Sequence, residues 1–453
     1  MGWSIIILDR DGFGFWNWVA KRAFKATFTR PDQSLAREKL RSTLTERELA
    51  VYIHFPFCKG ICRFCPYVKA RWNPKIVLKF IEALKAEIKA YGELLEDLGL
   101  KVVDVHMGGG TPSLLDGQQF KEIMDVLANS FELEREVLAI EANPSDLVNE
   151  SRVYDLLEAG VEEVSLGVQS FDALMLRKLG RSHTVEDSLE SIELLSDAGL
   201  DYLNIDLMYM IPGQTLDNWL MDLEIAAEQD VDEITCYPTL ITPQCLGYKA
   251  LKRGDIEQQP DKATFKRMIR ATYRILEPAG YESIEIYGFS RKEGWKYATV
   301  NYEMEGPLLA FGCGAMGFTG GYEYVNTCSV REYVRALGKG RLPIAGSREI
   351  GIEELAARYT ASRLFVCKEL DLKEFKDIFG EEFSHLISRT GLGKALWFLK
   401  LRGIVKRKGG RLKLTNKGLL TAHMQCWSFV LNVPCRIAEE YSRTPWPPAV
   451  TIP

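Results

Sequence analysis

The chain has 453 residues, of which 46% are hydrophobic and 26% charged, a composition typical of a folded globular protein with room for more than one domain. The net charge of −5 gives no electrostatic argument for nucleic-acid binding, and no apolar run is long enough to predict a transmembrane helix. Ten cysteines are too few here for a disulfide scaffold, so a close group of them predicts a metal site or a reactive site. We expect a cytoplasmic monomer that does not bind nucleic acid.

An extension at residues 1–48 differs in composition from the rest of the sequence. Residues 13–28 mix Phe and Trp with Lys and Arg, which predicts a short helix. We favour a helix that packs on the main domain through its aromatic side chains. The alternative is a helix at a membrane interface, and therefore a peripheral membrane contact.

Predicted strands and helices alternate about six times between residues 50 and 240. A strand is expected at 50–55, and a helix at 73–98 with Asn73 as its N-cap and Pro74 in its first position. Such alternation predicts an α/β fold, a partial (β/α)6-type barrel whose chemistry lies at the carboxyl ends of its strands. We expect the barrel core at 49–250 and an extension that completes the pocket at 251–345.

The last predicted unit, residues 346–453, does not continue the alternation of strands and helices. Two helices and a hairpin around Gly409 and Gly410 predict a winged-helix-like module, followed by an irregular tail. Its basic residues are compatible with nucleic-acid binding, but we favour a lid or a docking surface because the chain as a whole is acidic.

Three cysteines stand close together at Cys58, Cys62 and Cys65, with the spacing C-x3-C-x2-C. Thiolates are soft ligands for zinc, copper or iron–sulfur clusters. A structural zinc site usually takes four ligands, and no second cysteine pair follows nearby. Three thiolates on a four-iron cluster leave one iron open to a ligand. The spacing therefore favours an iron–sulfur cluster, with zinc or a chance grouping of cysteines as the alternatives.

The stretch YIHFPFCKGICRFC resembles the signature of radical S-adenosylmethionine (SAM) enzymes, in the branch of the oxygen-independent coproporphyrinogen III oxidases. MGGGTPSLL, IEANPSD, VSLGVQSF, LGRSH, NIDLMYMIPGQT and GCGAMGF continue the resemblance in order, over residues 48–345. It implies that Cys58, Cys62 and Cys65 bind a [4Fe-4S] cluster whose open iron chelates SAM. It also implies an electron donor such as flavodoxin or ferredoxin, and a 5'-deoxyadenosyl radical as the product of SAM cleavage.

The same resemblance implies which residues contact SAM. The matching positions are Tyr52, His54, Gly108, Gly109, Gly110, Thr111, Glu141, Gln169, Arg181 and Asp206. Without the resemblance, His54 would be interpreted as a core histidine and Arg181 as a solvated helix residue. Cys313, in the glycine-flanked turn GCGAMG, is the candidate catalytic residue that relays hydrogen or carries a group. The alternative for Cys313 is a buried structural cysteine.

Departures from the resemblance bear on the reaction. The oxidases carry one more cysteine two residues after the third ligand, where this chain has Tyr67. Haem-chaperone relatives carry an H-N-x-x-Y-W segment, but residues 298–303 read ATVNYE, which argues against haem chaperoning.

We therefore predict an enzyme, a radical SAM methyltransferase favoured over an oxidative decarboxylase. A second SAM would donate the methyl group to an aromatic, quinone or tetrapyrrole-like substrate, a planar or hydrophobic small molecule. The alternatives are decarboxylation of the coproporphyrinogen oxidase type and anaerobic haem ring opening. A further, non-enzyme alternative is a cluster-containing protein that binds and delivers haem.

Overall fold

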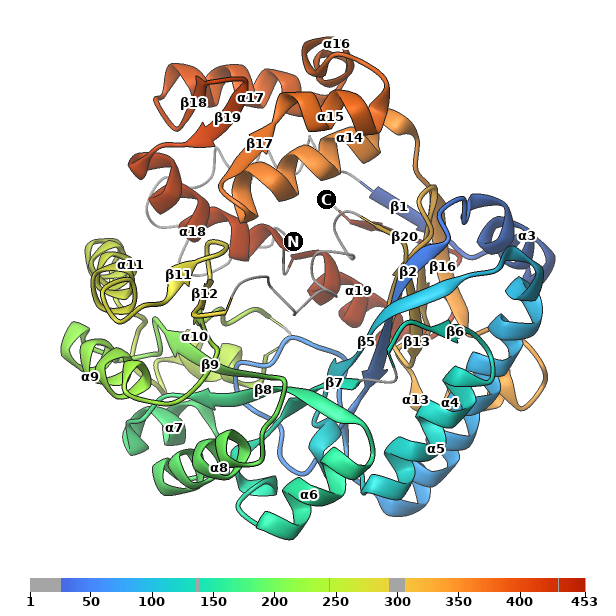
Figure 1. Ribbon diagram of the computed structural model, residues 1–453, viewed down its shortest axis with the longest axis horizontal. Helices are drawn as coiled ribbons and strands as arrows, with labels where there is room; N and C mark the ends of the chain where they lie inside the picture. Colours follow the sequence, from blue (N-terminus) through green and yellow to red (C-terminus); the bar gives the residue numbers. More distant parts are fainter. Residues whose placement is uncertain (1–25, 136–137, 244, 293–305, 431, 453) are drawn as a thin grey trace.

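The computed structural model describes residues 26–135, 138–243, 245–292, 306–430 and 432–452. A ring of helices surrounds a curved sheet, and a lobe of helices with a small sheet lies at one side of this ring (Figure 1). None of the described helices is long and apolar enough to cross a lipid bilayer.

Parallel strands form the centre of the main sheet, in the order β13, β2, β5, β7, β8, β9, β10. Because neighbouring parallel strands end at the same edge, their carboxyl ends meet along one rim. The bounds are β2 Glu48–Phe55, β5 Lys101–Gly109, β7 Leu138–Ala142, β8 Val161–Gln169, β9 Tyr202–Tyr209, β10 Glu233–Pro238 and β13 Leu308–Gly312.

The helices that connect these strands lie outside the sheet and bury one apolar face against it. Helix α4 begins at Pro74, as the sequence predicts, because Asn73 Oδ1 accepts from the backbone N–H groups of Lys75 and Ile76. The bounds are α4 Pro74–Leu95, η1 Glu96–Leu98, η2 Pro112–Leu114, α5 Gly117–Ala128, η3 Pro144–Asp146, α6 Glu150–Glu158, α7 Ala173–Leu179, α8 Val185–Asp197, α9 Leu216–Ala227, α10 Leu246–Arg253 and α11 Lys262–Leu276.

Antiparallel strands extend both edges of this sheet, which does not close within the described chain. The prediction of an α/β partial barrel is confirmed, with a mixed sheet in place of a purely parallel one. One edge continues as β12 Gly288–Ser290 and β11 Glu282–Ser283. The other edge continues as β14 Met316–Phe318, β15 Tyr322–Asn326, β16 Ile344–Glu349, β1 Ala26–Thr29 and β20 Ala449–Ile452. The short strand β6 Glu132–Leu133 pairs with β5. The remaining helices of this unit are α3 Gln33–Thr43 and α13 Val330–Leu337.

Strand β1 corrects one expectation about the N-terminal extension. Residues 26–28, the end of the predicted aromatic helix, lie in β1, which pairs with β16 and β20. Phe28 is buried there beside Val450, so this part of the extension is built into the sheet. The rest of the predicted helix lies outside the described residues.

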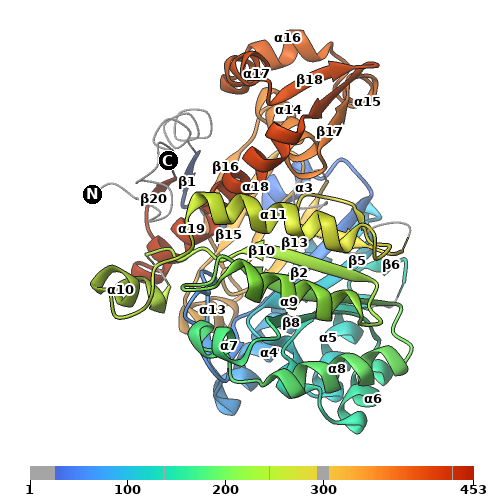
Figure 2. The ribbon, with the colours of Figure 1, turned by 90° about the vertical axis from the view of Figure 1, so that its left-hand side faces the viewer.

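The lobe has its own apolar core and a small antiparallel sheet in the order β17, β19, β18. Gly409 and Gly410 have positive φ angles of 57° and 77° and form the turn between β18 and β19. Helices α18 and α19 lead back from the lobe toward β20 (Figure 2). The bounds are α14 Ile352–Ala361, π-helix η4 Ser362–Val366, β17 Glu369–Asp371, α15 Leu372–Phe379, α16 Phe383–Ser388, α17 Gly391–Leu401, β18 Val405–Lys408, β19 Arg411–Leu414, α18 Asn416–Val430 and α19 Asn432–Arg443. The predicted domain boundaries stay predictions.

Candidate functional site

The loop after β2 is anchored at its ends and in its middle. Strands β3 (Phe57–Cys58) and β4 (Ala70–Arg71) pair and close residues 59–69 into a loop. In the middle, the Arg63 N–H donates to Leu179 O at 2.9 Å, and Arg63 O accepts from the Gly247 N–H at 2.8 Å. These backbone bonds fix the loop against α7 and α10, so the cysteines it carries have defined positions.

Cys58, Cys62 and Cys65 line one cavity of about 380 Å³ at the rim of the parallel strands. Among the described residues, no group of three His, Cys, Asp or Glu side chains converges closely enough to hold a single metal ion. Zinc needs ligands around one centre, whereas each thiolate of a four-iron cluster binds a different iron. The three thiols on one cavity are compatible with a [4Fe-4S] cluster, in which each thiolate binds a different iron.

Burial changes the acidity of two of these cysteines. It raises the pKa of the Cys58 thiol, and it raises that of Cys65 to about 12 despite the nearby charge of Lys69. Metal ligation requires thiolates, so binding of a cluster would release protons from this loop.

Residues 109–111, at the end of β5 and just after it, form a glycine shelf beside the loop that carries Cys58, Cys62 and Cys65, called here the cysteine loop. The Gly110 N–H donates to Phe55 O at 2.7 Å, and the Thr111 N–H donates to Phe57 O at 2.9 Å. A Cβ atom on Gly110 would lie 2.4 Å from Phe55 O, so only glycine lets these two backbone segments approach. Gly109, Gly110 and Thr111 all line the cavity.

Glu141, in β7, points to the cavity across this shelf. Its carboxylate accepts from the Gly109 N–H at 2.9 Å and lies 3.6 Å from His106 Nε2. Burial acts to raise the pKa of Glu141, but His106 and the Gly109 N–H outweigh it, and the pKa lies below its ordinary value. An ionised Glu141 can accept hydrogen bonds from amino or hydroxyl groups of a ligand.

Arg181 connects the cysteine loop to the ends of two strands. Its guanidinium donates to Cys62 Sγ at 3.3 Å, to Gly167 O at 2.8 Å and to Asn143 Oδ1. His183 Nε2 donates to Val168 O at 3.0 Å, which leaves Nδ1 to accept from Arg181 Nε at 3.3 Å. Burial, and then the charge of Arg181, lower the pKa of His183 to about 3, so this imidazole is neutral.

Gln169, the last residue of β8, and Asp206, within β9, line the same cavity. Gln169 has a positive φ of 71°, and the turn after it is held by the buried Asp222, which accepts from the Phe171 N–H at 2.6 Å. Asp206 accepts from Asn204 Nδ2 at 3.1 Å. Burial, and then the charge of Glu141, raise the pKa of Asp206 to about 7.

Tyr52, His54 and Gly108 do not line the cavity but support its wall. His54 Nε2 donates to Val68 O at 3.0 Å, and its Nδ1 accepts from the Tyr52 hydroxyl at 3.1 Å. The His54 ring fills the space beside Gly109, and the Glu141 carboxylate fills the space beside Gly108. The predicted SAM contacts of these three residues stay predictions, because their described contacts are to protein groups.

Cys313 also lies away from the cavity. It is fully buried in the main core, directly after Gly312, whose N–H donates to the buried Glu87 at 2.8 Å. Burial raises the pKa of the Cys313 thiol well above its ordinary value. This position favours the structural alternative for Cys313, and the hydrogen-relay role stays a prediction without a described contact to the cavity.

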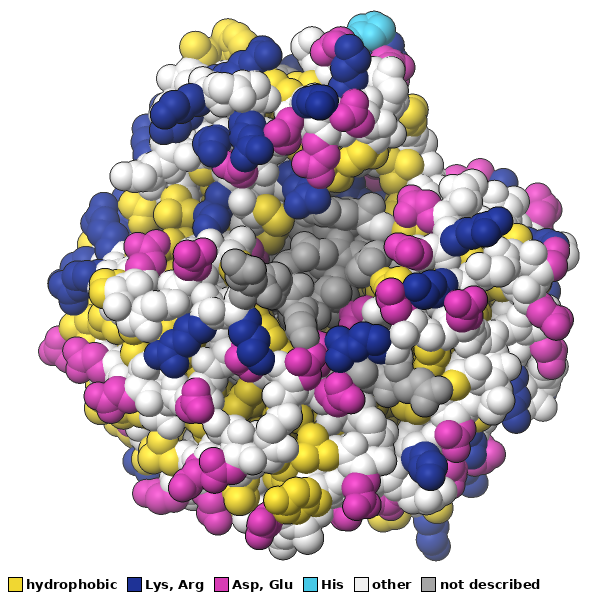
Figure 3. Space-filling view, in the orientation of Figure 1, with side chains coloured by type: hydrophobic (Ala, Val, Ile, Leu, Met, Phe, Trp, Pro, Cys, Tyr) yellow, Lys and Arg dark blue, Asp and Glu magenta, His cyan; other side chains and the backbone are white. Residues whose placement is uncertain are grey.

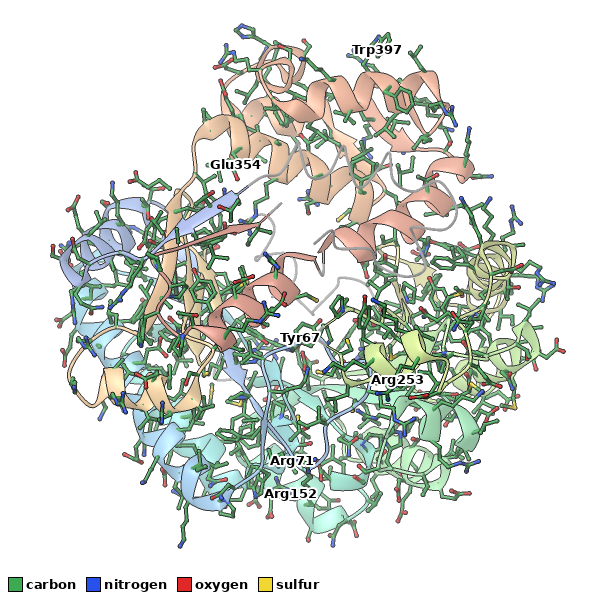
Figure 4. The ribbon with its side chains drawn as sticks, turned by 180° about the vertical axis from the view of Figure 1, so that it is seen from behind. Tyr67, Arg71, Arg152, Arg253, Glu354 and Trp397 are labelled. Carbon is green, nitrogen blue, oxygen red and sulfur yellow. The ribbon has the colours of Figure 1, made fainter. Side chains whose placement is uncertain are left out.

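Sequence reasoning missed the far end of the cavity, which is lined by acids and aromatic rings. Glu233, Thr235 and Tyr237 alternate along β10 and all face the cavity, so their period-two spacing was an available signal. Glu285 and Tyr287 come from the short segment between β11 and β12, which no motif marks. Burial raises the pKa of Glu233 to about 7 and that of Glu285 to about 8. Tyr67 lines the cavity as well and lies near the centre of the molecule (Figure 4).

Comparisons with known proteins agree with this geometry. The family model of the radical SAM superfamily matches residues 52–226. The Heme chaperone HemW of Bacillus subtilis is 28% identical over 82% of this chain and 96% of its own length. The Heme chaperone HemW of Escherichia coli is 31% identical over 59% of this chain and 70% of its own length. Coproporphyrinogen III oxidase (HemN) from Escherichia coli, a radical SAM enzyme, has the same fold: the TM-score is 0.76 at 22% identity, over 89% of this chain and 94% of that one.

These relatives overturn the predicted reaction. Both curated relatives are named as haem chaperones and neither as a methyltransferase or an oxidoreductase, so the prediction of a C-methylating enzyme is wrong and the non-enzyme alternative is better supported. The sequence argument against haem chaperoning used residues 298–303, which lie outside the described residues. The cysteine loop, the glycine shelf, the family model and the relatives lead to one conclusion: the chain belongs to the radical SAM superfamily, in the branch that resembles the oxygen-independent coproporphyrinogen III oxidase.

Proposed function

We propose that this chain binds and delivers haem, with a [4Fe-4S] cluster and SAM as its resident cofactors. The observation that carries the proposal is the alignment with a Heme chaperone HemW over 82% of this chain and 96% of the relative. Membership of the radical SAM superfamily implies the cluster, SAM and an electron donor. The cavity described above has groups suited to both cofactors.

Different residues of the cavity would bind these two cofactors. Cys58, Cys62 and Cys65 would hold the cluster, which supplies single electrons when it is bound. Beside them, the shelf at 109–111 would accommodate SAM by close backbone approach, while Glu141 accepts from its amino or hydroxyl groups. Arg181 would bind a carboxylate through its planar guanidinium. A second SAM molecule stays a prediction.

The far wall of the cavity is the surface that best suits a planar tetrapyrrole. It combines the rings of Tyr237 and Tyr287, 6.0 Å apart between centroids, with the apolar side chains of Leu240 and Val366. No histidine is among the described lining residues. Of the five histidines in the chain, four are at most 4% exposed, and His385 lies on the lobe. We therefore expect haem to stack on this aromatic wall without histidine ligation.

A haemin titration tests both parts of the proposal. Anaerobically reconstituted protein with SAM should give a saturable Soret change at one haem per chain, and should pass that haem to an apo-protein acceptor. Tyr287→Ala should weaken haem binding at least tenfold, whereas Tyr154→Ala, which removes an exposed tyrosine of α6, should not. His385→Ala should leave the titration unchanged.

Different failures have different meanings. If no saturable Soret change occurs, the proposed function is wrong. If haem binds with equal affinity to wild type and to the Tyr287 variant, the function stands but haem binds elsewhere.

A further inference from the structure

One surface of the lobe has a charge opposite to that of the whole chain. Residues 391–417 contain nine Lys and Arg and no Asp or Glu, although the chain has a net charge of −5. Most of these residues belong to α17, β18 and β19, which lie side by side at the outer end of the lobe in two perpendicular views (Figures 1 and 2). In Figure 3, Lys and Arg side chains gather over the same elements.

Most of these cations form no ion pair with another described residue. Arg411 and Lys413 form ion pairs with Glu369 of β17. Within the part of the chain that the structure describes, no ion pair involves the six exposed cations Lys394, Lys400, Arg402, Lys406, Arg407 and Lys408. Their charge therefore faces solvent.

The same surface exposes two large apolar side chains. Trp397 and Leu401 are each 65% exposed and stand one turn apart on α17, while Leu392, Leu396 and Leu399 bury the opposite face in the core of the lobe. Figure 4 shows Trp397 at the outer end of the lobe, directed away from the rest of the molecule. Exposed Trp and Leu within a field of Lys and Arg are typical of a surface that lies at a lipid interface.

We propose that α17 and the β18–β19 hairpin form a docking surface for a membrane that contains anionic lipids. Trp397 and Leu401 enter the headgroup region, and the six cations contact lipid phosphates, their aliphatic stems lying along the interface. A nucleic acid would match the charge but would leave Trp397 and Leu401 without an apolar environment. An electron donor must approach the cysteine loop, and Trp397 lies far from Tyr67, which follows that loop's last cysteine (Figure 4).

Vesicle co-sedimentation of the full chain tests this surface. The probes are vesicles of phosphatidylcholine alone and vesicles with 30% phosphatidylglycerol. We expect binding to the anionic vesicles only, weakened at least tenfold when the salt concentration rises from 0.1 M to 0.5 M. The triple variant Lys406→Glu, Arg407→Glu, Lys408→Glu should bind at least tenfold more weakly, and Trp397→Ala several-fold more weakly.

Matched variants separate local docking from general charge. Arg267→Glu, Arg270→Glu and Arg274→Glu make the same charge change on the exposed face of α11, and Leu78→Ala removes an apolar side chain that is 57% exposed on α4. Both controls should bind within twofold of wild type, and circular dichroism verifies the fold of each variant.

Three outcomes would overturn the proposal. The first is equal binding to both kinds of vesicle. The second is unchanged binding of the hairpin and Trp397 variants. The third is tighter binding to a duplex DNA oligonucleotide than to anionic vesicles, lost in the hairpin variant, which would make the surface a nucleic-acid site. None of these results depends on haem binding, so the proposed function is tested separately.

Discussion

Gly110→Ala tests whether the glycine shelf holds the cysteine loop in place. The new Cβ atom would lie 2.4 Å from Phe55 O and 2.7 Å from Phe57 O, while ordinary contacts begin at 3.4 Å. Both atoms belong to backbone just before Cys58, so no change of rotamer can relieve the overlap. The segment must move by about 1 Å, the shortfall from ordinary contact.

The cost follows from the contacts that this movement breaks. The bonds Gly110 N–H to Phe55 O and Thr111 N–H to Phe57 O contribute about 1 kcal/mol each, and overpacking costs about 1–3 kcal/mol. We expect the free energy of unfolding to fall by about 3 kcal/mol. Because the shelf lines the proposed SAM site, we also expect SAM affinity to fall at least ~10-fold, equivalent to about 1.4 kcal/mol.

The assays are urea unfolding, iron content after anaerobic reconstitution, and calorimetric titration with SAM. Gly60→Ala is the control, because it lies on the same cysteine loop and its Cβ would meet nothing within 4 Å. If Gly110→Ala matches Gly60→Ala in stability, iron content and SAM affinity, the shelf does not position the loop, and the reasoning is refuted.

Three further predictions concern single side chains. Burial raises the pKa of the Asp222 carboxyl to about 7, so between pH 4 and 7 the folded state keeps a proton that the unfolded state loses. As the pH rises through this range, the free energy of unfolding of the wild type should therefore fall by up to about 4 kcal/mol relative to that of Asp222→Asn. Urea midpoints of the two proteins that change in parallel with pH would contradict this. Arg181→Met removes a hydrogen bond to Cys62 Sγ. Because a hydrogen bond to a ligand sulfur stabilises the reduced cluster, here by ~1 kcal/mol, its loss should lower the reduction potential of the cluster by about 40 mV. An unchanged potential in an EPR-monitored redox titration would show that this bond does not tune the cluster. Cys62→Ala should abolish the visible absorbance of the cluster, because it removes a ligand. Cys313→Ala should leave that absorbance unchanged and lower the free energy of unfolding by only about 1 kcal/mol. Iron retained by the Cys62→Ala variant would contradict the proposed ligand set.

Local signals in the sequence predict much of the barrel. Asn73 and Pro74 mark the start of α4, because a side-chain cap and a missing N–H act within a few residues. Residues in the carboxyl-terminal halves of parallel strands, such as Glu141 in β7 and Asp206 in β9, lie toward one rim of the sheet. The same residues carry the family resemblance, which is why most predicted site residues lie together.

The rest depends on contacts between distant parts of the chain. Strand β1 pairs with β20 near the other end of the sequence, and no local pattern at 26–29 encodes that partner. Glu285 and Tyr287 enter the cavity because the edge strands fold back beside β10. His54 bonds to Val68 O, a backbone group whose position only the folded loop defines, and its predicted contact with SAM stays a prediction. The reaction was predicted wrongly because Tyr67 distinguishes this chain from the oxidases without indicating what replaces their chemistry.

The most direct test of the central claim is to follow the haem itself. Reduced, reconstituted protein is incubated with SAM and haemin, an apo-protein acceptor is added, and the tetrapyrrole and the SAM-derived products are analysed by mass spectrometry. A haem-delivery protein predicts intact haem in the acceptor and no methylated or ring-opened tetrapyrrole. A modified tetrapyrrole formed in step with S-adenosylhomocysteine or 5'-deoxyadenosine would contradict the account.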